Sequence, residues 1–428
     1  MSPVSDPTHA VTDSAPATRR GTLGKRLLLM VVVFVLAAKP ADLLLGYLAG
    51  THRRHLLRLD PNAAVRHRSA EFDYVFHTNR YGFRGPVVAE AKPVGRQRLV
   101  VLGDSFVAGV AVADEDVFTA VLSEKLSAGG IEVVNVGRAG TSTIREVTLY
   151  EQIGRRFAPD AVILVYFLGN DLAEVVEEET DEELADWKPS GILRRAAFAW
   201  CSNAYLELAM QKRVARNLAS IGPRTTAQVL ARVRDEATRS GVDPDLAAGR
   251  YGRLPESVRD LAEAGELPEY RFLQACLAPA RFRHSIDPDD EFFQRAWPRT
   301  RRHLDRLKRS VESDGATLLL VVIPESMQVS EAALEFNRRL GFELDDEWNR
   351  ASPGRTAEAL ARWARESGVP VLDVKPALKD HPGPTFFAQD GHCTAVGHRV
   401  IARSLAAWPA LRTALRTALR FPLENGER

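Results

Sequence analysis

The sequence predicts an α/β protein in which helices cover both faces of a parallel sheet. Five short apolar runs, rich in Val, Ile and Leu and bounded by turn residues, alternate with stretches of helical periodicity. Continuous apolar runs are typical of strands that are buried on both faces. Alternation of strands and helices favours right-handed crossovers in a doubly wound sheet. A chain of 428 residues has room for one such domain with an insertion, or for two domains.

The predicted elements follow one another along most of the chain. The strands are expected at 98–103, 131–137, 160–169, 316–324 and 369–374, and the helices near 115–128, 143–156, 298–313 and 354–367. Residues 173–298 break this rhythm, because an acidic run is followed by charged helical sequence. We therefore expect a main domain at 98–412 with a helical insertion at about 173–298, and a C-terminal tail at 413–428.

The N-terminal hundred residues give three further segments. Residues 1–26 are polar and end in basic residues, which predicts a disordered cytoplasmic tail. Residues 27–50 are apolar except for "KPAD", and three interpretations stay open: a membrane anchor, a cleaved signal peptide and a buried helix. The first two place the catalytic part outside the cytoplasm, either anchored to a bacterial membrane or secreted. Residues 51–97 are expected to be an extension packed on the sheet.

Composition excludes two classes of protein. The 57 basic and 56 acidic residues give a net charge of +1, without the basic excess of a nucleic-acid-binding surface. The three cysteines, Cys201, Cys276 and Cys393, are too few for a disulfide scaffold. A single bridge between Cys201 and Cys276 and three free thiols both stay open.

Polar and small residues stand at the carboxyl ends of the predicted strands. Ligands bind at these ends in open parallel sheets. The residues at these positions are Gly103-Asp104-Ser105 after the first strand, Gly137 and Gly140 after the second, Gly169-Asn170-Asp171 after the third, and Asp390, His392 and His398 beyond the fifth. A hydroxyl, a glycine-rich turn, an amide and an acid–imidazole pair are thus expected at one edge of the sheet.

This set of groups is suited to acyl transfer, which needs neither a metal nor a cofactor. His392 is the candidate base for the Ser105 hydroxyl, and Asp390 is the candidate residue that orients the imidazole. The N–H groups of Ser105 and Gly140 and the amide of Asn170 are candidate oxyanion donors.

Simpler interpretations exist as well. Asp104 and Ser105 also suit a helix cap, "GND" suits an ordinary turn, and the Asp390, His392, Cys393 and His398 group suits a zinc site.

Four blocks of the sequence resemble the SGNH/GDSL hydrolase superfamily: "GDSF" at 103–106, "NVGRAG" at 135–140, "GND" at 169–171 and "DGHCTAVGH" at 390–398. The resemblance implies a three-layer α/β/α, flavodoxin-like fold with about five parallel strands. It also implies a triad of Ser105, Asp390 and His392, with Gly140 and Asn170 completing the oxyanion hole. Three features are similar to a membrane-linked branch that includes periplasmic polysaccharide O-acetyltransferases: the single residue between acid and histidine, the upstream "NRYGFRGP" and the apolar N-terminal segment.

Three functions are therefore considered. The first is a serine esterase that cleaves a short-chain acyl ester, such as an acetyl ester, through an acyl-enzyme on Ser105. The second is an O-acyltransferase that passes the acyl group to an extracytoplasmic polysaccharide. The third is a degenerate member of the superfamily that binds glycan without catalysis. The expected partners are an acyl ester, an acetylated glycan or acyl donor, and the membrane, but no nucleic acid. The natural substrate and the oligomeric state stay open.

Overall fold

The structure, a computed structural model, describes residues 19–48, 62–177, 191–205, 222–283, 290–344 and 354–415. The chain forms two compact units, one of Met1–Arg54 with Lys188–Arg213 and the other of His55–Trp187 with Val214–Arg428. The predicted tails lie mostly outside the described residues, at 1–18 and 416–428.

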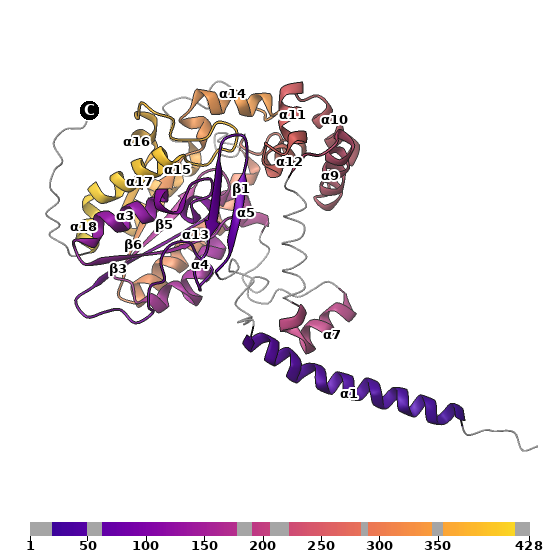
Figure 1. The fold of residues 1–428 in the computed structure, drawn as a ribbon. Helices are drawn as coiled ribbons and strands as arrows, with labels where there is room; N and C mark the ends of the chain where they lie inside the picture. The colour runs from indigo at the N-terminus through magenta and orange to yellow at the C-terminus, as the bar shows by residue number, and fades with distance from the viewer. Residues whose placement is uncertain are drawn as a thin grey trace, which may run out of the picture. The chain divides into compact units, whose positions relative to one another are not determined.

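A five-stranded parallel sheet forms the centre of the larger unit (Figure 1). Its strands, in spatial order, are β4 (Ile131–Gly137), β3 (Gln97–Gly103), β5 (Ala161–Phe167), β6 (Thr317–Ile323) and β7 (Val371–Asp373). All four neighbouring pairs are parallel. Each strand coincides with one of the five apolar runs, so the predicted sheet is confirmed.

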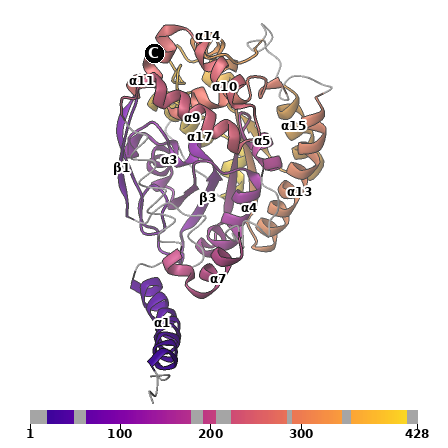
Figure 2. The same cartoon turned by 90° about the vertical axis from the view of Figure 1, so that its right-hand side faces the viewer.

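Helices cover both faces of this sheet, as Figure 2 shows with α13 and α15 on one side and α3 on the other. One face packs against α4 (Thr143–Gln152), α13 (Glu291–Ser313) and α15 (Arg355–Ser367). The other packs against α2 (Ser105–Ala108), α3 (Phe118–Ser127), α16 (Lys375–Lys379), α17 (Ala395–Ala407) and α18 (Pro409–Ala414). Successive residues of β3 enter opposite layers, because side chains alternate along a strand. The predicted three-layer α/β/α fold is confirmed.

Helix α13 begins seven residues earlier than predicted. The Asp290 side chain accepts a hydrogen bond from the N–H of Phe293 at 3.0 Å and caps the helix. Pro298, which marked the start of the helix in the sequence, lies inside it. The N-terminal cap therefore sets the boundary, and one proline is tolerated within the helix.

The insertion is helical wherever the structure describes it. Its helices are α5 (Asp171–Glu177), α7 (Ile192–Trp200), α9 (Thr226–Arg239), α10 (Pro244–Gly252), α11 (Glu256–Ala264) and α12 (Glu269–Leu277). Helices α9 to α12 share a hydrophobic cluster with α14 (Glu331–Arg339), which follows β6. The cluster includes Tyr251, Phe272 and Phe336. Helices α9 to α12 are thus joined to the segment after β6 by a core of their own.

The extension before the sheet forms a hairpin of β1 (Ala64–Arg68) and β2 (Asp73–His77). Tyr74 and Phe76 of β2 are buried against Ala108 of α2, the helix that begins with Ser105. Further along, Phe83 enters the core of the sheet. The hairpin therefore packs beside the end of β3 rather than only on the outside of the sheet.

The smaller unit contains α1 (Arg19–Leu48) and α7. The polar residues that interrupt its apolar sequence have partners. Lys39 Nζ donates to the carbonyl of Trp200 at 2.9 Å, and Asp42 accepts from the N–H of Ala204 at 2.7 Å. These bonds attach α1 to the end of α7 and explain why "KPAD" interrupts the apolar run.

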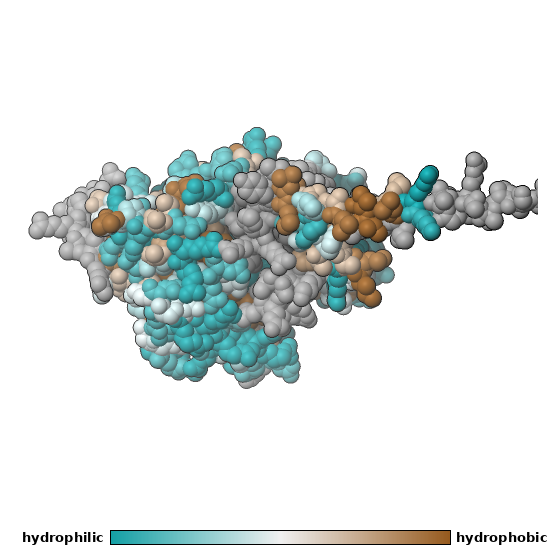
Figure 3. Space-filling view, turned by 90° about the horizontal axis from the view of Figure 1, so that it is seen from below, coloured by the Kyte–Doolittle hydropathy of each residue, from teal (hydrophilic) through white to brown (hydrophobic). Residues whose placement is uncertain are grey.

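Apolar side chains gather on the surface of α1 and α7 (Figure 3). Examples are Leu36 and Ile192, which are 62% and 85% exposed. Among the residues that the structure describes, none of the helices combines the length and the apolar character that a bilayer crossing requires. The segment predicted at 27–50 extends two residues beyond α1, whose described range ends at Leu48.

Candidate active site

Ser105 lies where β3 passes into α2. Asp104 caps this helix, because its Oδ1 accepts a hydrogen bond from the N–H of Phe106 at 3.0 Å. The capping interpretation is thus correct for Asp104. The Ser105 side chain lines a cavity of about 440 Å³ instead.

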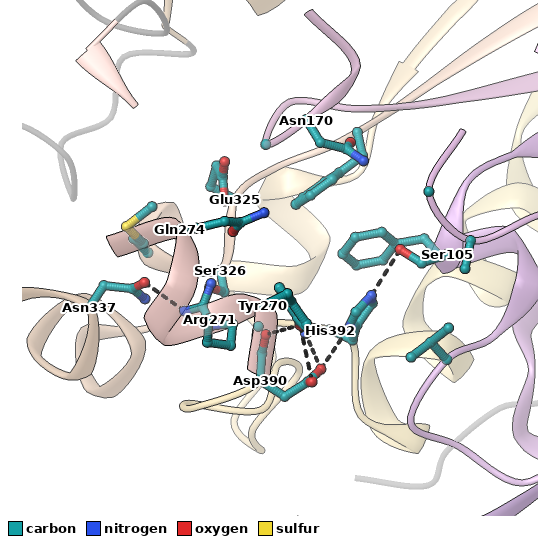
Figure 4. Close-up of a pocket in the computed structure, with 18 of the residues that line it drawn as sticks. Ser105, Asn170, Tyr270, Arg271, Gln274, Glu325, Ser326, Asn337, Asp390 and His392 are labelled. Atoms are coloured by element: carbon teal, nitrogen blue, oxygen red, sulfur yellow. Dashed lines mark hydrogen bonds and ion pairs between the residues drawn. The ribbon is translucent and has the colours of Figure 1, made fainter. Parts of the chain in front are cut away.

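The three predicted triad residues meet in this cavity (Figure 4). His392 Nε2 lies 2.8 Å from Ser105 Oγ, and His392 Nδ1 lies 2.5 Å from Asp390 Oδ1. With Nδ1–H donating to the carboxylate, Nε2 is left to accept the hydroxyl proton. This arrangement makes Ser105 a potential nucleophile with a base in hydrogen-bond contact.

Gly391 explains how one intervening residue lets Asp390 reach His392. Its φ of +89° lies in the left-handed region, which L side chains rarely adopt. The chain turns back there, and Asp390 Oδ1 also accepts from the N–H of His392 at 3.2 Å. The hydroxyl of Tyr270, on α12, donates to Asp390 Oδ2 at 3.1 Å. The carboxylate is therefore fixed from two sides.

The charge state of the pair follows from burial and from mutual attraction. Burial by itself would lower the pKa of His392, but the charge and hydrogen bond of Asp390 raise this pKa above its ordinary value. Burial would likewise raise the pKa of Asp390, but His392 and Arg271 hold it below its ordinary value. An ionised Asp390 beside a basic imidazole is the combination that proton abstraction requires.

The predicted oxyanion residues line the same cavity. Gly140 has a φ of +70°, and no atom lies within 4 Å of the position that its Cβ would take. The backbone there is open to a ligand. Asn170 Nδ2 donates to Glu174 Oε1 at 3.0 Å, and the Asn170 amide also hydrogen-bonds Asp104. The amide is thus positioned by two carboxylates. A substrate oxygen would compete with these carboxylates for the hydrogen bonds that the amide N–H groups donate.

Several cavity residues were not found from the sequence. Helix α12 contributes Tyr270, Arg271 and Gln274. Arg271 donates to the carbonyl of Gln389 at 2.8 Å and to Asn337 Oδ1 at 2.6 Å. No sequence motif marks these residues, because they reach the site through the fold of the insertion.

Glu325 was also missed, although it follows the end of β6 in the same way that Ser105 follows β3. It is 5% exposed, and burial raises its pKa to about 7. Its Oε1 has no hydrogen-bond partner among the described residues. The sequence signal is its position at the carboxyl end of the fourth predicted strand, where ligands bind in open parallel sheets.

His398 and Cys393 are not among the described residues that line the cavity at Ser105. His398 is buried, with its ring stacked on Phe118, and its Nδ1 accepts from the Phe118 N–H at 3.2 Å. Burial lowers its pKa to about 3, so it is a neutral core residue. Within the described part of the chain, no group of three His, Cys, Asp or Glu side chains is placed to hold a metal ion. The zinc alternative has no support in this geometry.

All three cysteines are free thiols, so the bridge between Cys201 and Cys276 that the sequence left open is not formed.

Comparison with known proteins adds one family match. Residues 283–420 match the family described as "SGNH hydrolase-like domain, acetyltransferase AlgX". The matched part contains Asp390 and His392 but not Ser105. None of the curated proteins compared with the chain matches it.

Solved structures of low identity align over most of the chain. A putative lipolytic protein of the G-D-S-L family from Desulfitobacterium hafniense DCB-2 is 13% identical, with 73% of this chain and 98% of that chain covered and a TM-score of 0.33. A lipase/acylhydrolase from Enterococcus faecalis is 12% identical, with 76% and 100% covered and a TM-score of 0.35. An acetyl xylan esterase, AlAXEase, is 10% identical, with 72% and 97% covered and a TM-score of 0.34.

The family match covers the loop with Asp390 and His392, and the sheet brings this loop to Ser105 at the end of β3. Residues 283–420, which contain Asp390 and His392, are therefore similar to the SGNH hydrolase-like domain of acetyltransferase AlgX.

Proposed function

We propose that this protein is a serine esterase that cleaves a short-chain acyl ester, such as an acetyl ester, through an acyl-enzyme on Ser105. The observation that carries the proposal is the chain of contacts from Asp390 through His392 to the Ser105 hydroxyl, at 2.5 and 2.8 Å. Hydrogen-bond contact between nucleophile, base and orienting acid is the geometric signature of this chemistry.

The reaction would proceed in two halves. Ser105 Oγ attacks the ester carbonyl carbon while His392 Nε2 takes the hydroxyl proton. The oxyanion accepts hydrogen bonds from the N–H groups of Ser105 and Gly140 and from the Asn170 amide. His392 then gives its proton to the departing alcohol, which leaves the acyl group on Oγ. In the second half a water attacks the acyl-enzyme with His392 as base, and the free acid and Ser105 are released.

The test is hydrolysis of 4-nitrophenyl acetate by the purified protein. Ser105→Ala should abolish turnover, and a fluorophosphonate probe should label Ser105 alone. Ser142, which is buried at the start of α4, provides a control, because Ser142→Ala should leave labelling unchanged. Full residual activity in Ser105→Ala would overturn the assignment of the nucleophile.

O-acyl transfer is a second candidate, because the matched family is described as an acetyltransferase. The two activities share the acyl-enzyme and differ in whether water or a second alcohol takes the acyl group. The α12 side chains that line the cavity stand where they would control access of either acceptor. Product analysis with an acyl donor, with and without an oligosaccharide, separates the two. Acylated sugar would favour the transferase, and free acid alone would favour the esterase.

We also propose that the catalytic unit works outside the cytoplasm. Support comes from the basic residues of 19–26 followed by the apolar run of 27–38. A reporter enzyme that is active only outside the cytoplasm, fused after residue 60, should be active. The same reporter fused to a chain without residues 19–48 should be inactive. Equal reporter activity in both fusions would contradict the proposal.

A further inference from the structure

The loop that carries Asp390 and His392 is held by a carboxylate from another part of the chain. Glu71 lies in the turn between β1 and β2, and its side chain accepts hydrogen bonds from three consecutive backbone N–H groups. Ala388 donates to Oε1 at 2.9 Å, Gln389 to both oxygens at 3.1 and 3.0 Å, and Asp390 to Oε2 at 2.8 Å. Convergent backbone N–H groups of this kind form an anion-binding nest.

The loop itself does not satisfy these three donors. Its ends are joined by an antiparallel bridge between Phe386 and Cys393. Within the loop, the Phe387 N–H donates to the His392 carbonyl at 2.9 Å, and the Gly391 N–H donates to the Phe387 carbonyl at 3.2 Å. The N–H groups at 388–390 have Glu71 as their acceptor. A single residue outside the loop thus fixes the backbone at Asp390.

The turn that carries Glu71 is fixed on both sides. The ring of Phe72 packs edge-to-face against Phe387, with 5.6 Å between the centroids. The N–H of Ala70 donates to the carbonyl of Glu266, between α11 and α12, at 3.1 Å. Glu71 is therefore held against the loop by its neighbours in the sequence and does not reach it as a free side chain.

The same hairpin also contacts the segment that follows Ser105. Arg84, which comes soon after β2, lies over the ring of Phe76 at 4.8 Å and donates to the carbonyl of Val112 at 2.6 Å. It also donates to the carbonyl of Gly109, the C-cap of α2. The hairpin and its flank thus contact the chain on both sides of the Ser105–His392 hydrogen bond.

We propose that Glu71 is a positioning residue for Asp390 and His392, and that the β1–β2 hairpin is a built-in component of the active site. Glu71 touches no reacting atom and acts through the backbone of Asp390. The effect on catalysis rests on the proposed function of Asp390 and His392, whereas the effect on the loop does not.

The kinetic test compares Glu71→Gln with the matched control Asp73→Asn, in the full chain. Asp73 lies on the same hairpin and forms an exposed ion pair with Arg66. In Glu71→Gln an amide NH2 faces backbone donors, so the loop should shift. We expect kcat for 4-nitrophenyl acetate to fall about 10–100-fold with little change in KM, because small misplacements of reacting groups are costly. Asp73→Asn should match the wild type.

A double-mutant cycle separates positioning from general damage to the fold. If Glu71 acts through Asp390, Glu71→Gln should lower kcat little in an Asp390→Asn background. An equal fold-loss in both backgrounds would overturn the proposal.

Hydrogen exchange tests the loop without reference to activity. Backbone amides at 388–390 should exchange faster in Glu71→Gln than in Asp73→Asn or the wild type. Unchanged exchange would overturn the role of Glu71. If the wild type shows no hydrolysis at all, the proposed function fails, and the exchange measurement still decides whether Glu71 holds the loop.

Discussion

The imidazole of His392 is subject to two opposing influences, and their balance sets the pH at which it can act. Burial favours the neutral ring, but the Asp390 carboxylate favours the charged ring, and the pKa is raised above its ordinary value of 6.5. A base must be neutral to accept a proton. The form of His392 that can accept a proton is therefore lost as the pH falls through this raised pKa.

The raised pKa of His392 predicts how activity depends on pH. A profile of kcat/KM against pH for 4-nitrophenyl acetate should show a limb that falls toward low pH, with a midpoint above 6.5. Asp390→Asn should move the midpoint to lower pH and reduce kcat by on the order of 10³–10⁴, since the imidazole loses its partner. A midpoint that stays the same in the variant would contradict the pairing of Asp390 with His392.

Glu325 gives a second prediction, on stability. Burial raises its pKa from 4.5 to about 7, so the folded state favours the neutral carboxyl. Its contribution to stability is present below pH 4.5 and is lost as the pH rises through about 7. Glu325→Gln removes the buried charge and should raise the free energy of unfolding at pH 8 by about 1–3 kcal/mol. Urea unfolding at pH 4 and pH 8 measures the difference.

The wild type and Glu325→Gln should unfold alike at pH 4, which is the internal control for this measurement. A variant that is less stable than the wild type at pH 8 would contradict the prediction. It would mean that an ionised Glu325 is stabilised by Arg281 and Arg271, the positive charges that oppose the shift.

Residues next to strand ends could be predicted, and residues from remote segments could not. Ser105 and Asn170 directly follow strands, and His392 stands in a short block of recognisable pattern. Glu71 and Tyr270 reach the site from a hairpin turn and an insertion helix. Their contribution depends on contacts across more than 100 residues of sequence, which no local pattern carries.

At the scale of elements, α12 joins the insertion to the loop that carries Asp390 and His392. Arg271 donates from this helix to the carbonyl of Gln389 and to Asn337 Oδ1 on α14. The side chain is nearly buried, at 7% exposed. Removing the guanidinium would leave a buried acceptor on Asn337 and a partly buried acceptor on Gln389 without their donor.

Arg271→Met should therefore lower the free energy of unfolding by about 2–4 kcal/mol. Arg239→Met is the matched control, because Arg239 forms only exposed ion pairs with Asp235 and Glu236, and it should change stability by less than about 0.5 kcal/mol. Urea unfolding measures both. Equal effects of the two variants would show that Arg271 is not a structural link.

The strands were easier to predict than the helices for a physical reason. A strand buried on both faces reads as a continuous apolar run, and all five runs formed strands. The start of α13 depends on the side chain of Asp290 rather than on periodicity, and Pro298 gave the wrong boundary. In α1, the polar residues that interrupt the apolar run form hydrogen bonds, Lys39 to Trp200 at the end of α7 and Asp42 to Ala204 beyond it.

At the scale of the whole molecule, all the described residues that line the cavity at Ser105 belong to the larger unit. A variant that begins at His55 should therefore hydrolyse 4-nitrophenyl acetate with a kcat/KM close to that of the full chain. Thermal unfolding of the variant shows whether it has folded. A folded variant without activity would mean that residues 1–54 contribute to catalysis.

The hydrogen bonds of the candidate active site join distant parts of the chain: 287 residues separate Ser105 from His392, and 319 separate Glu71 from Asp390. During translation, which adds roughly 5–20 residues each second, the serine leaves the ribosome long before its base has been synthesised. The hydrogen bond between Ser105 and His392 consequently cannot form until nearly all of the chain has emerged. The candidate active site is thus completed only near the end of the synthesis of the chain.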